Sequence, residues 1–183
     1  MKNVLLTTLL VCALAVSVAP PSHAFGIHGI VWNPDDADDT GIGVGTRWGL
    51  RSVGPFTIEG RASWIHFGDA SMDAFPLEAG LIAGRRLSDR RIGLYAGATV
   101  GFWILSGDAD FDDNLGASIL GGINYATGKL LWYGEIQYVF LDTEFSTDVI
   151  PNTEINLDGF QLNIGVQFGG TAPITQDSEN EKK

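Results

Sequence analysis

The residues best suited to chemistry are five ionisable side chains within otherwise apolar or glycine-rich stretches: Arg47, Glu59, Arg61, Glu78 and Glu135. Two neighbouring carboxylates can divide the roles of general acid and general base. Carboxylates and guanidiniums can instead pair with one another, which is the condition under which buried charges are tolerated. The choice between these interpretations depends on the elements that carry the five residues.

A second acidic group lies between Ser106 and Asn114 and consists of Asp108, Asp110, Asp112 and Asp113. Carboxylates at alternate positions occur in calcium-binding loops, but this stretch lacks the glycine and the bidentate glutamate of an EF-hand. It is a candidate cation-binding loop, in which Ca²⁺ or Mg²⁺ would bridge carboxylates to the phosphates of outer-leaflet lipid. The sequence predicts no other cofactor.

Clusters of Gly, Pro, Asp and Asn divide the chain into eight candidate strands. Most are about as long as the 9–11 residues that a tilted membrane-spanning strand needs, or slightly longer. They are expected at 25–33, 41–51, 56–67, 75–87, 91–105, 115–127, 130–142 and 157–168. Three connections are short, at 52–55, 88–90 and 127–129, and they alternate with four longer ones, at 34–40, 68–74, 106–114 and 143–156. This alternation predicts an up-and-down meander with all short turns at one end.

The last strand, 159–168, shows most clearly how the two faces differ. Side chains alternate between the faces of a strand. One face of this strand is wholly apolar, whereas the other carries only glycine and amide side chains. An apolar face opposite a compact polar one is the pattern of a transmembrane β-strand. The other strands repeat it except the first, where Ile27 and Val31 alternate with Ile30 and Trp32, so that its inward parity stays open.

These patterns predict an all-β fold, an eight-stranded antiparallel up-and-down transmembrane β-barrel. The five ionisable residues then share the inward parity. Because side chains just fill the interior of an eight-stranded barrel, there is little room for a substrate. We therefore predict that the five residues form a lumen ion-pair network that plugs the barrel, and we predict no catalytic residues.

Aromatic residues of the outward parity gather toward the two ends of the strands. Amphipathic rings favour the headgroup level of a membrane, so two aromatic girdles are expected. The short-turn end would carry Trp48, Phe56, Tyr125, Trp132 and Phe168, and the other end Trp64, Phe75, Phe102, Phe140 and Phe160. Aromatics scattered through the core of a soluble sandwich would not explain why glycines and charges share the opposite face.

Charge is distributed unequally along the chain, which carries 11 basic and 22 acidic residues and a net charge of −11. The long connections and the strand ends beside them are acidic, whereas the basic residues of the strands and turns cluster at the short-turn end. The distribution predicts acidic extracellular loops. So acidic a chain is not expected to bind nucleic acid.

Both termini have compositions distinct from the centre of the chain. Residues 1–24 combine Lys2, an uncharged apolar run at 4–18 and the small residues Ser22 and Ala24, as in a signal peptide cleaved after Ala24. Residues 169–183 are polar and are predicted to form a disordered periplasmic tail. The predicted division is thus 1–24 signal peptide, 25–168 outer-membrane β-barrel and 169–183 tail.

Three motifs in the centre of the chain are LYAGATVGF at 94–102, GGINY at 121–125 and YGEIQY at 133–138. They resemble the small eight-stranded outer-membrane β-barrels of Gram-negative bacteria, the OmpA/OmpX-type barrel domains. The resemblance implies an eight-stranded meander inserted by the barrel-assembly machinery, which in this family reads the last strand and its terminal aromatic residue, Phe168 here. The chain departs from that pattern because further residues follow Phe168. We also expect the protein to be a monomer.

The sequence therefore predicts an integral protein of the cell outer membrane with a structural or surface-interaction role and no enzymatic activity, whose partners are outer-membrane lipids and lipopolysaccharide. One alternative is a lipid A-modifying enzyme, for which His66 lies at the right end with Ser63, Asp69 and Ser71 nearby. The His-x-Ser spacing of the deacylases is absent, however, because Phe67 and Gly68 follow His66. Another alternative is a soluble lipocalin-like periplasmic carrier, whose apolar lumen would conflict with the polar inward parity.

Overall fold

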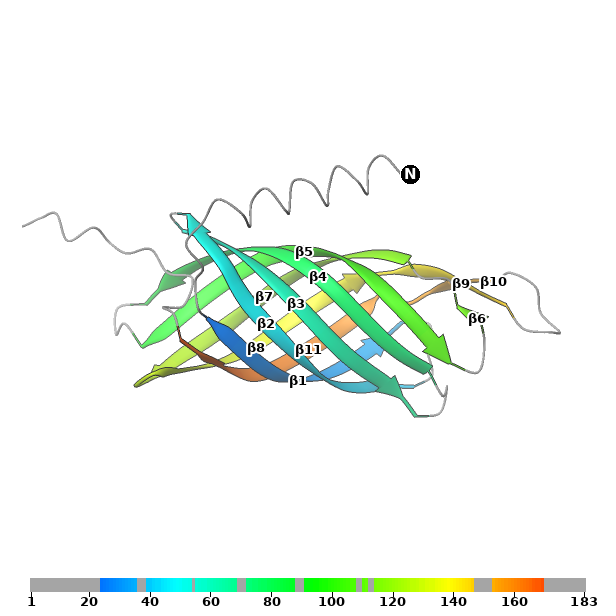
Figure 1. The fold of residues 1–183 in the computed structure, drawn as a ribbon, viewed down its shortest axis with the longest axis horizontal. Helices are drawn as coiled ribbons and strands as arrows, with labels where there is room; N and C mark the ends of the chain where they lie inside the picture. Colours follow the sequence, from blue (N-terminus) through cyan, green and yellow to red (C-terminus); the bar gives the residue numbers. More distant parts are fainter. Residues whose placement is uncertain are drawn as a thin grey trace, which may run out of the picture.

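Eight strands of this chain close into an antiparallel β-barrel, seen in the computed structural model of Figure 1. The structure describes residues 24–35, 39–53, 55–68, 72–87, 91–107, 110–111, 114–146 and 153–169. The barrel strands are β1 (Phe25–Pro34), β2 (Gly41–Val53), β3 (Phe56–Phe67), β4 (Met72–Arg86), β5 (Ile92–Gly107), β7 (Asn114–Thr127), β8 (Leu130–Phe140) and β11 (Gly159–Phe168). Strands consecutive around the barrel pair with each other, and β1 pairs with β11 to close it. The predicted eight-stranded antiparallel up-and-down barrel is confirmed as a fold.

Three short strands form a separate sheet in the order β10-β9-β6: β6 (Asp110–Phe111), β9 (Asp142–Ser146) and β10 (Thr153–Asn156). These short strands lie almost wholly within the predicted connections 106–114 and 143–156, where the sequence did not predict them. The β9–β10 hairpin extends the β8–β11 pair past the barrel rim, and the Leu157 N–H donates to the Leu141 carbonyl at 2.8 Å where the two meet. Backbone pairing beyond the barrel needs no alternation of apolar and polar side chains. The sequence pattern therefore did not indicate β6, β9 and β10.

Several predicted segments are not among the described residues. The predicted signal peptide is described only at Ala24, and the predicted tail only at Gly169. Within the part of the chain that is described, no helix has the length and apolar character needed to cross a membrane.

Exposure alternates along the barrel strands and divides their side chains into an inner and an outer set. In β1 the even-numbered residues, including His28, Ile30 and Trp32, point inward and are buried. This settles the parity that the sequence left open, and it places His28 inside the barrel. The inner set fills the lumen, and the outer set is largely apolar.

The interior of the barrel is divided into a polar and an apolar part. The apolar part consists of buried residues at the strand ends beside the long connections: Ile30, Trp32, Ile65, Phe67, Met72, Ala74, Trp103, Leu105, Val139, Leu141 and Leu157. Trp32 packs 5.3 Å from Phe67 and 5.0 Å from Trp103 between ring centroids. The expectation of a polar inward face throughout is therefore wrong at this end, where large apolar side chains exclude water instead.

Candidate functional site

Four of the five predicted lumen residues form one ion-pair cluster. Arg47 comes from β2, Glu59 and Arg61 from β3, and Glu135 from β8. Arg47 Nη2 lies 2.7 Å from Glu59 Oε2, and Arg61 Nη1 lies 2.6 Å from Glu135 Oε1. The cross-contacts also exist, since Arg61 Nη2 lies 2.5 Å from Glu59 Oε1 and Arg47 Nη1 lies 3.6 Å from Glu135 Oε2. Each guanidinium thus contacts both carboxylates.

The strand register explains how residues distant in the chain meet. Arg47 and Arg61 are direct cross-strand partners between β2 and β3, and Glu59 is two positions from Arg61 on the same face. Glu135 reaches them across the lumen from β8. All four side chains are at most 5% exposed, and two positive charges balance two negative ones. Such pairing offsets the desolvation that makes lone buried charges so costly.

Glu78, the fifth predicted residue, lies beside the cluster but is held differently. Thr99 Oγ1 donates to Glu78 Oε1 at 2.6 Å, and Gln137 Nε2 donates to the same oxygen at 3.3 Å. Among the described residues, the ion pairs of Arg47 and Arg61 do not include Glu78. Neutral donors therefore satisfy this carboxylate.

Amide and hydroxyl side chains complete the polar part of the interior. Asn163 Nδ2 donates to Glu135 Oε1 at 3.0 Å, and Gln161 Nε2 donates to Asn163 Oδ1 at 2.9 Å. Gln137 accepts from Arg61 Nη1 at 3.2 Å and donates to Ser118 Oγ at 2.8 Å. The predicted network omitted Gln137, although its spacing of two from Glu135 puts it on the same face.

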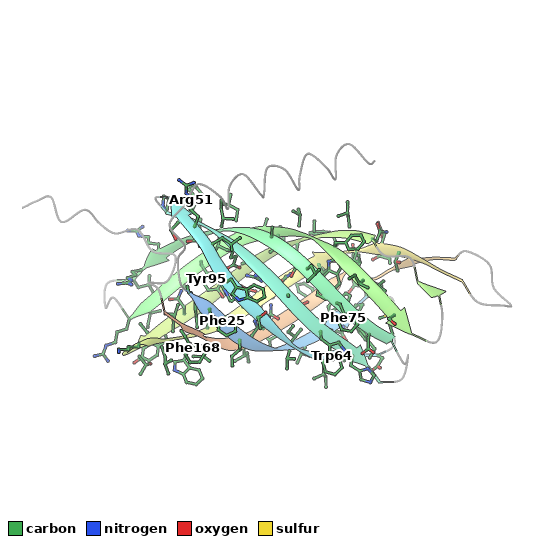
Figure 2. The ribbon with its side chains drawn as sticks, in the orientation of Figure 1. Phe25, Arg51, Trp64, Phe75, Tyr95 and Phe168 are labelled. Atoms are coloured by element: carbon green, nitrogen blue, oxygen red, sulfur yellow. The ribbon has the colours of Figure 1, made fainter. Side chains whose placement is uncertain are left out.

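His28 and two tyrosines border the cluster and were not predicted to belong to it. The Tyr133 hydroxyl lies 2.9 Å from His28 Nδ1. The Arg47 guanidinium lies 4.6 Å from the Tyr133 ring centroid and 5.7 Å from that of Tyr95, which is a cation–π arrangement. Figure 2 shows Tyr95 in the half of the barrel that also carries the labels of Phe25 and Phe168. Large apolar residues on both faces of the first strand left the inward parity of His28 unrecognised in the sequence.

The polar interior is suited to holding strands together rather than to binding a substrate. The carboxylates of Glu59 and Glu135 are occupied by guanidiniums, and Glu78 by two donors. Beside them is a hollow lined by Arg47, Tyr95, Asn124, Leu131, Tyr133 and Gln167, which is too small for a water molecule. General acid–base chemistry requires a reacting group within hydrogen-bond distance, and this hollow has no space for one.

A second polar cluster lies on the outer face, at the rim beside the long connections. His66 Nδ1 lies 3.0 Å from Asp73 Oδ1, and the Trp64 indole N–H donates to the same oxygen at 2.9 Å. The Trp64 and His66 rings stack, with centroids 6.3 Å apart and planes at 29°. Of the predicted neighbours, Ser63 lies on the inward parity of β3, while Asp69 and Ser71 lie outside the described residues.

All of the predicted girdle residues lie on the outside of the barrel and are exposed. Figure 2 labels Phe25 and Phe168 near one end of the barrel, and Trp64 and Phe75 near the other. The exposed set comprises Trp48, Phe56, Trp64, Phe75, Phe102, Tyr125, Trp132, Phe140, Phe160 and Phe168.

The candidate cation-binding loop falls mostly outside the described part of the chain. Asp108, Asp112 and Asp113 are not described, and Asp110 is described only as the backbone of β6. Among described residues there is no group of three His, Cys, Asp or Glu side chains that could hold a metal ion.

Comparison with known proteins identifies the fold. No protein-family model matches the sequence, and no curated protein matches it. The structure is similar to that of Neisserial surface protein A (NspA), with a TM-score of 0.63 and 16% identity over 80% of this chain and 94% of that one. It is also similar to the outer membrane protein AlkL in lipid bilayers, with a TM-score of 0.53 and 14% identity over 84% of this chain and 93% of that one. The outer membrane enzyme PagL gives a TM-score of 0.53 and 14% identity, over 78% of this chain and 98% of that one. The chain therefore has the fold of small outer-membrane β-barrels, as the sequence motifs predicted.

Proposed function

We propose that this chain is an integral outer-membrane β-barrel protein with a structural or surface-interaction role and a lumen plugged by its own side chains. The observation that carries the proposal is the distribution of side chains across the barrel wall. Large apolar residues around the outside, such as Ile42, Ile136 and Ile164, are 59–67% exposed. The charged pairs lie inside. Water disfavours so large an apolar surface, whereas hydrocarbon stabilises it.

The orientation follows from the charges and the connections. In bacterial outer-membrane barrels the short turns face the periplasm and the long loops face the medium. By that rule the acidic connections and the β10-β9-β6 sheet are extracellular, and the chain after Phe168 is periplasmic. Export through a cleaved signal peptide at residues 1–24 and insertion by the barrel-assembly machinery belong to the same proposal. The likeness to NspA, AlkL and PagL supports it through the fold alone.

We expect the partners to be outer-membrane lipids and lipopolysaccharide, and we expect the barrel to be a monomer. The barrel has no open sheet edge, because β1 pairs with β11 along ten residue pairs. A closed barrel satisfies its backbone hydrogen bonds without a second chain.

Migration on a denaturing gel, with and without boiling, tests the proposal. A closed barrel extracted from the membrane fraction is expected to migrate as a folded species until it is boiled. A soluble lipocalin-like carrier would instead be found in the periplasmic fraction, and that result would refute membrane integration. Conductance in planar bilayers tests the plug separately, since an open pore would give steady current steps.

A lipid A-modifying enzyme is the second candidate, and the His66–Asp73 pair is the observation that favours it. An imidazole oriented by a carboxylate at the outer rim is one half of a nucleophile-activating arrangement. No hydroxyl group is bonded to His66 among the hydrogen bonds of the described residues. The test compares lipid A acylation in cells that carry wild-type protein or His66→Ala. A change in acylation would establish the enzyme, and unchanged acylation leaves the structural role.

A further inference from the structure

The outer wall of the barrel is hollowed where it is formed by β8, β11, β1, β2 and β3. The hollow has a volume of about 710 Å³ and is open to the outside. Its walls are large apolar side chains, with Trp132 at one end and Trp64 at the other. Gly29, Thr46 and Ala62 lie along its floor.

Small outward residues on adjacent strands create this groove. Gly29 pairs directly with Ile164 on one side and Val44 on the other, and Val44 pairs with Trp64. A Cβ added to Gly29 would meet no atom within 4 Å, so the space above this backbone is empty, whereas Ile164 and Val44 on the neighbouring strands project outward on either side. Gly29 therefore leaves the outer face low between the large side chains of Ile164, Val44 and Trp64.

The groove has the length of one lipid chain. It crosses four interstrand steps from Trp132 on β8 to Trp64 on β3, which at the usual strand spacing is about 19 Å. Because the strands of a barrel are tilted, a line across them climbs obliquely along the barrel wall. Trp64 and Trp132 belong to opposite girdles, so a chain that enters at Trp64 runs within the groove toward the short-turn end.

The rim end of the groove is polar and has acceptor character. Asp73 Oδ1 receives the Trp64 N–H and faces His66 Nδ1. Because a carboxylate only accepts hydrogen bonds, His66 Nδ1 is the donor in this contact. The His66 and Asp73 side chains are 51% and 38% exposed, so the Asp73 carboxylate is open to a headgroup that donates hydrogen bonds.

We propose that the groove holds one acyl chain of a lipid from the long-connection leaflet, whose headgroup donates hydrogen bonds to the Asp73 carboxylate beside His66. This inference rests on the proposed membrane integration. The headgroup chemistry is an amine or a hydroxyl, because the Asp73 carboxylate attracts donors and repels anions. A trimethylated headgroup of the same charge lacks the required N–H.

Native mass spectrometry of the full-length barrel tests the inference. The detergent-solubilised protein is mixed with equal amounts of phosphatidylethanolamine and phosphatidylcholine that have identical chains. The wild type is expected to retain one phosphatidylethanolamine with a preference of about fivefold, which is the effect of roughly one hydrogen bond. Equal retention of both lipids would overturn the headgroup assignment.

Filling the groove tests the position of the chain. Gly29→Leu is expected to reduce retention of both lipids at least about fivefold, because a leucine side chain would occupy the floor. The matched control is Gly121→Leu, since Gly121 is also an outward strand glycine, its added Cβ would meet its nearest atom at 3.9 Å, and its strand, β7, does not line the groove. Ala62→Leu repeats the test should Gly29→Leu fail to fold. Equal retention by groove-filling and control variants would overturn the site.

Changing the rim pair tests the headgroup contact. His66→Ala combined with Asp73→Asn is expected to abolish the preference for phosphatidylethanolamine while retention of a lipid persists. Asp35→Asn is the control, because Asp35 is another rim carboxylate that accepts from an outward aromatic, the Tyr138 hydroxyl at 3.1 Å. Each variant is first checked for heat-modifiable migration. A barrel that migrates as folded but retains no lipid refutes this inference and leaves the proposed membrane integration standing.

Discussion

Arg61 is the side chain on which the lumen cluster most depends. It is 4% exposed, and its guanidinium contacts both Glu59 and Glu135. Arg61→Met would keep much of the side-chain volume but leave two buried carboxylates with one guanidinium, that of Arg47. Removing one partner of a buried ion pair costs about 3–5 kcal/mol, because the remaining charge is uncompensated.

The second substitution, Glu135→Gln, shows whether charge is the cause. Alone, it leaves Arg61 with Glu59 and is expected to cost a similar amount. Combined with Arg61→Met, it leaves Arg47 and Glu59 as a neutral pair 2.7 Å apart. The double variant should therefore lose less unfolding free energy than the two single variants lose together. For residues in direct contact we expect this difference to be at least about 2 kcal/mol.

The assay is equilibrium unfolding in urea of the barrel reconstituted into lipid vesicles, with the folded fraction read from heat-modifiable migration. Arg85→Met is the control, since Arg85 is an exposed residue at the short-turn end and should change stability by less than about 0.5 kcal/mol. Strictly additive costs for Arg61→Met and Glu135→Gln would refute the ion-pair interpretation. So would a cost for Arg61→Met no larger than that for Arg85→Met.

Three further predictions address the outer face, the packing and the lumen. Ile136→Arg introduces a charge at mid-strand on the outer face and should destabilise the barrel in vesicles by about 2–4 kcal/mol, whereas Ile136→Leu should be neutral in the same unfolding assay. Gly122→Ala should lower stability by about 1–3 kcal/mol, because its Cβ would collide with the Tyr95 ring and lie 2.7 Å from the Gly134 carbonyl oxygen. Gly121→Ala, whose Cβ would meet its nearest atom, the Tyr95 carbonyl oxygen, at 3.9 Å, should be tolerated, and equal effects at Gly121 and Gly122 would contradict the assignment of faces. Wild-type barrels in planar bilayers should give no steady conductance steps, and reproducible steps of a single size would refute a plugged lumen.

The alternation of side chains made the fold predictable from the sequence where the two faces differ in polarity. In β11, amides and glycines oppose large apolar residues, so one reading of the strand identifies its outward face. In β1, Ile27 and Val31 face outward while Ile30 and Trp32 face inward, and hydropathy cannot distinguish the two sets. The inward His28 was overlooked for this reason.

The same limit applies to the interior near the long connections. Ile65 and Phe67 are fully buried, yet the outward face of their strand is also apolar. The alternation of residues along the strand therefore does not show where the polar part of the lumen ends and the apolar part begins. The ion-pair cluster was easier to anticipate, because a charge inside an apolar stretch requires a partner. Which carboxylate meets which guanidinium depended on cross-lumen distances, and those follow from the closed barrel rather than from spacing along the chain.

The divided interior bears directly on transport. Along the barrel, the ion-pair cluster and the apolar cluster lie in series, and they oppose a permeating ion by different means. To pass the ion-pair cluster, an ion would have to displace one charged side chain from its partner. The apolar cluster instead excludes the water that a permeating ion needs, as hydrophobic constrictions do in channels. Loosening only the charges, as in Arg61→Met with Glu135→Gln, leaves Trp32 packed against Phe67 and Trp103. We therefore expect that double variant to be less stable than wild type and still closed to ions. Stability and closure are separate properties of this lumen, because different side chains supply them.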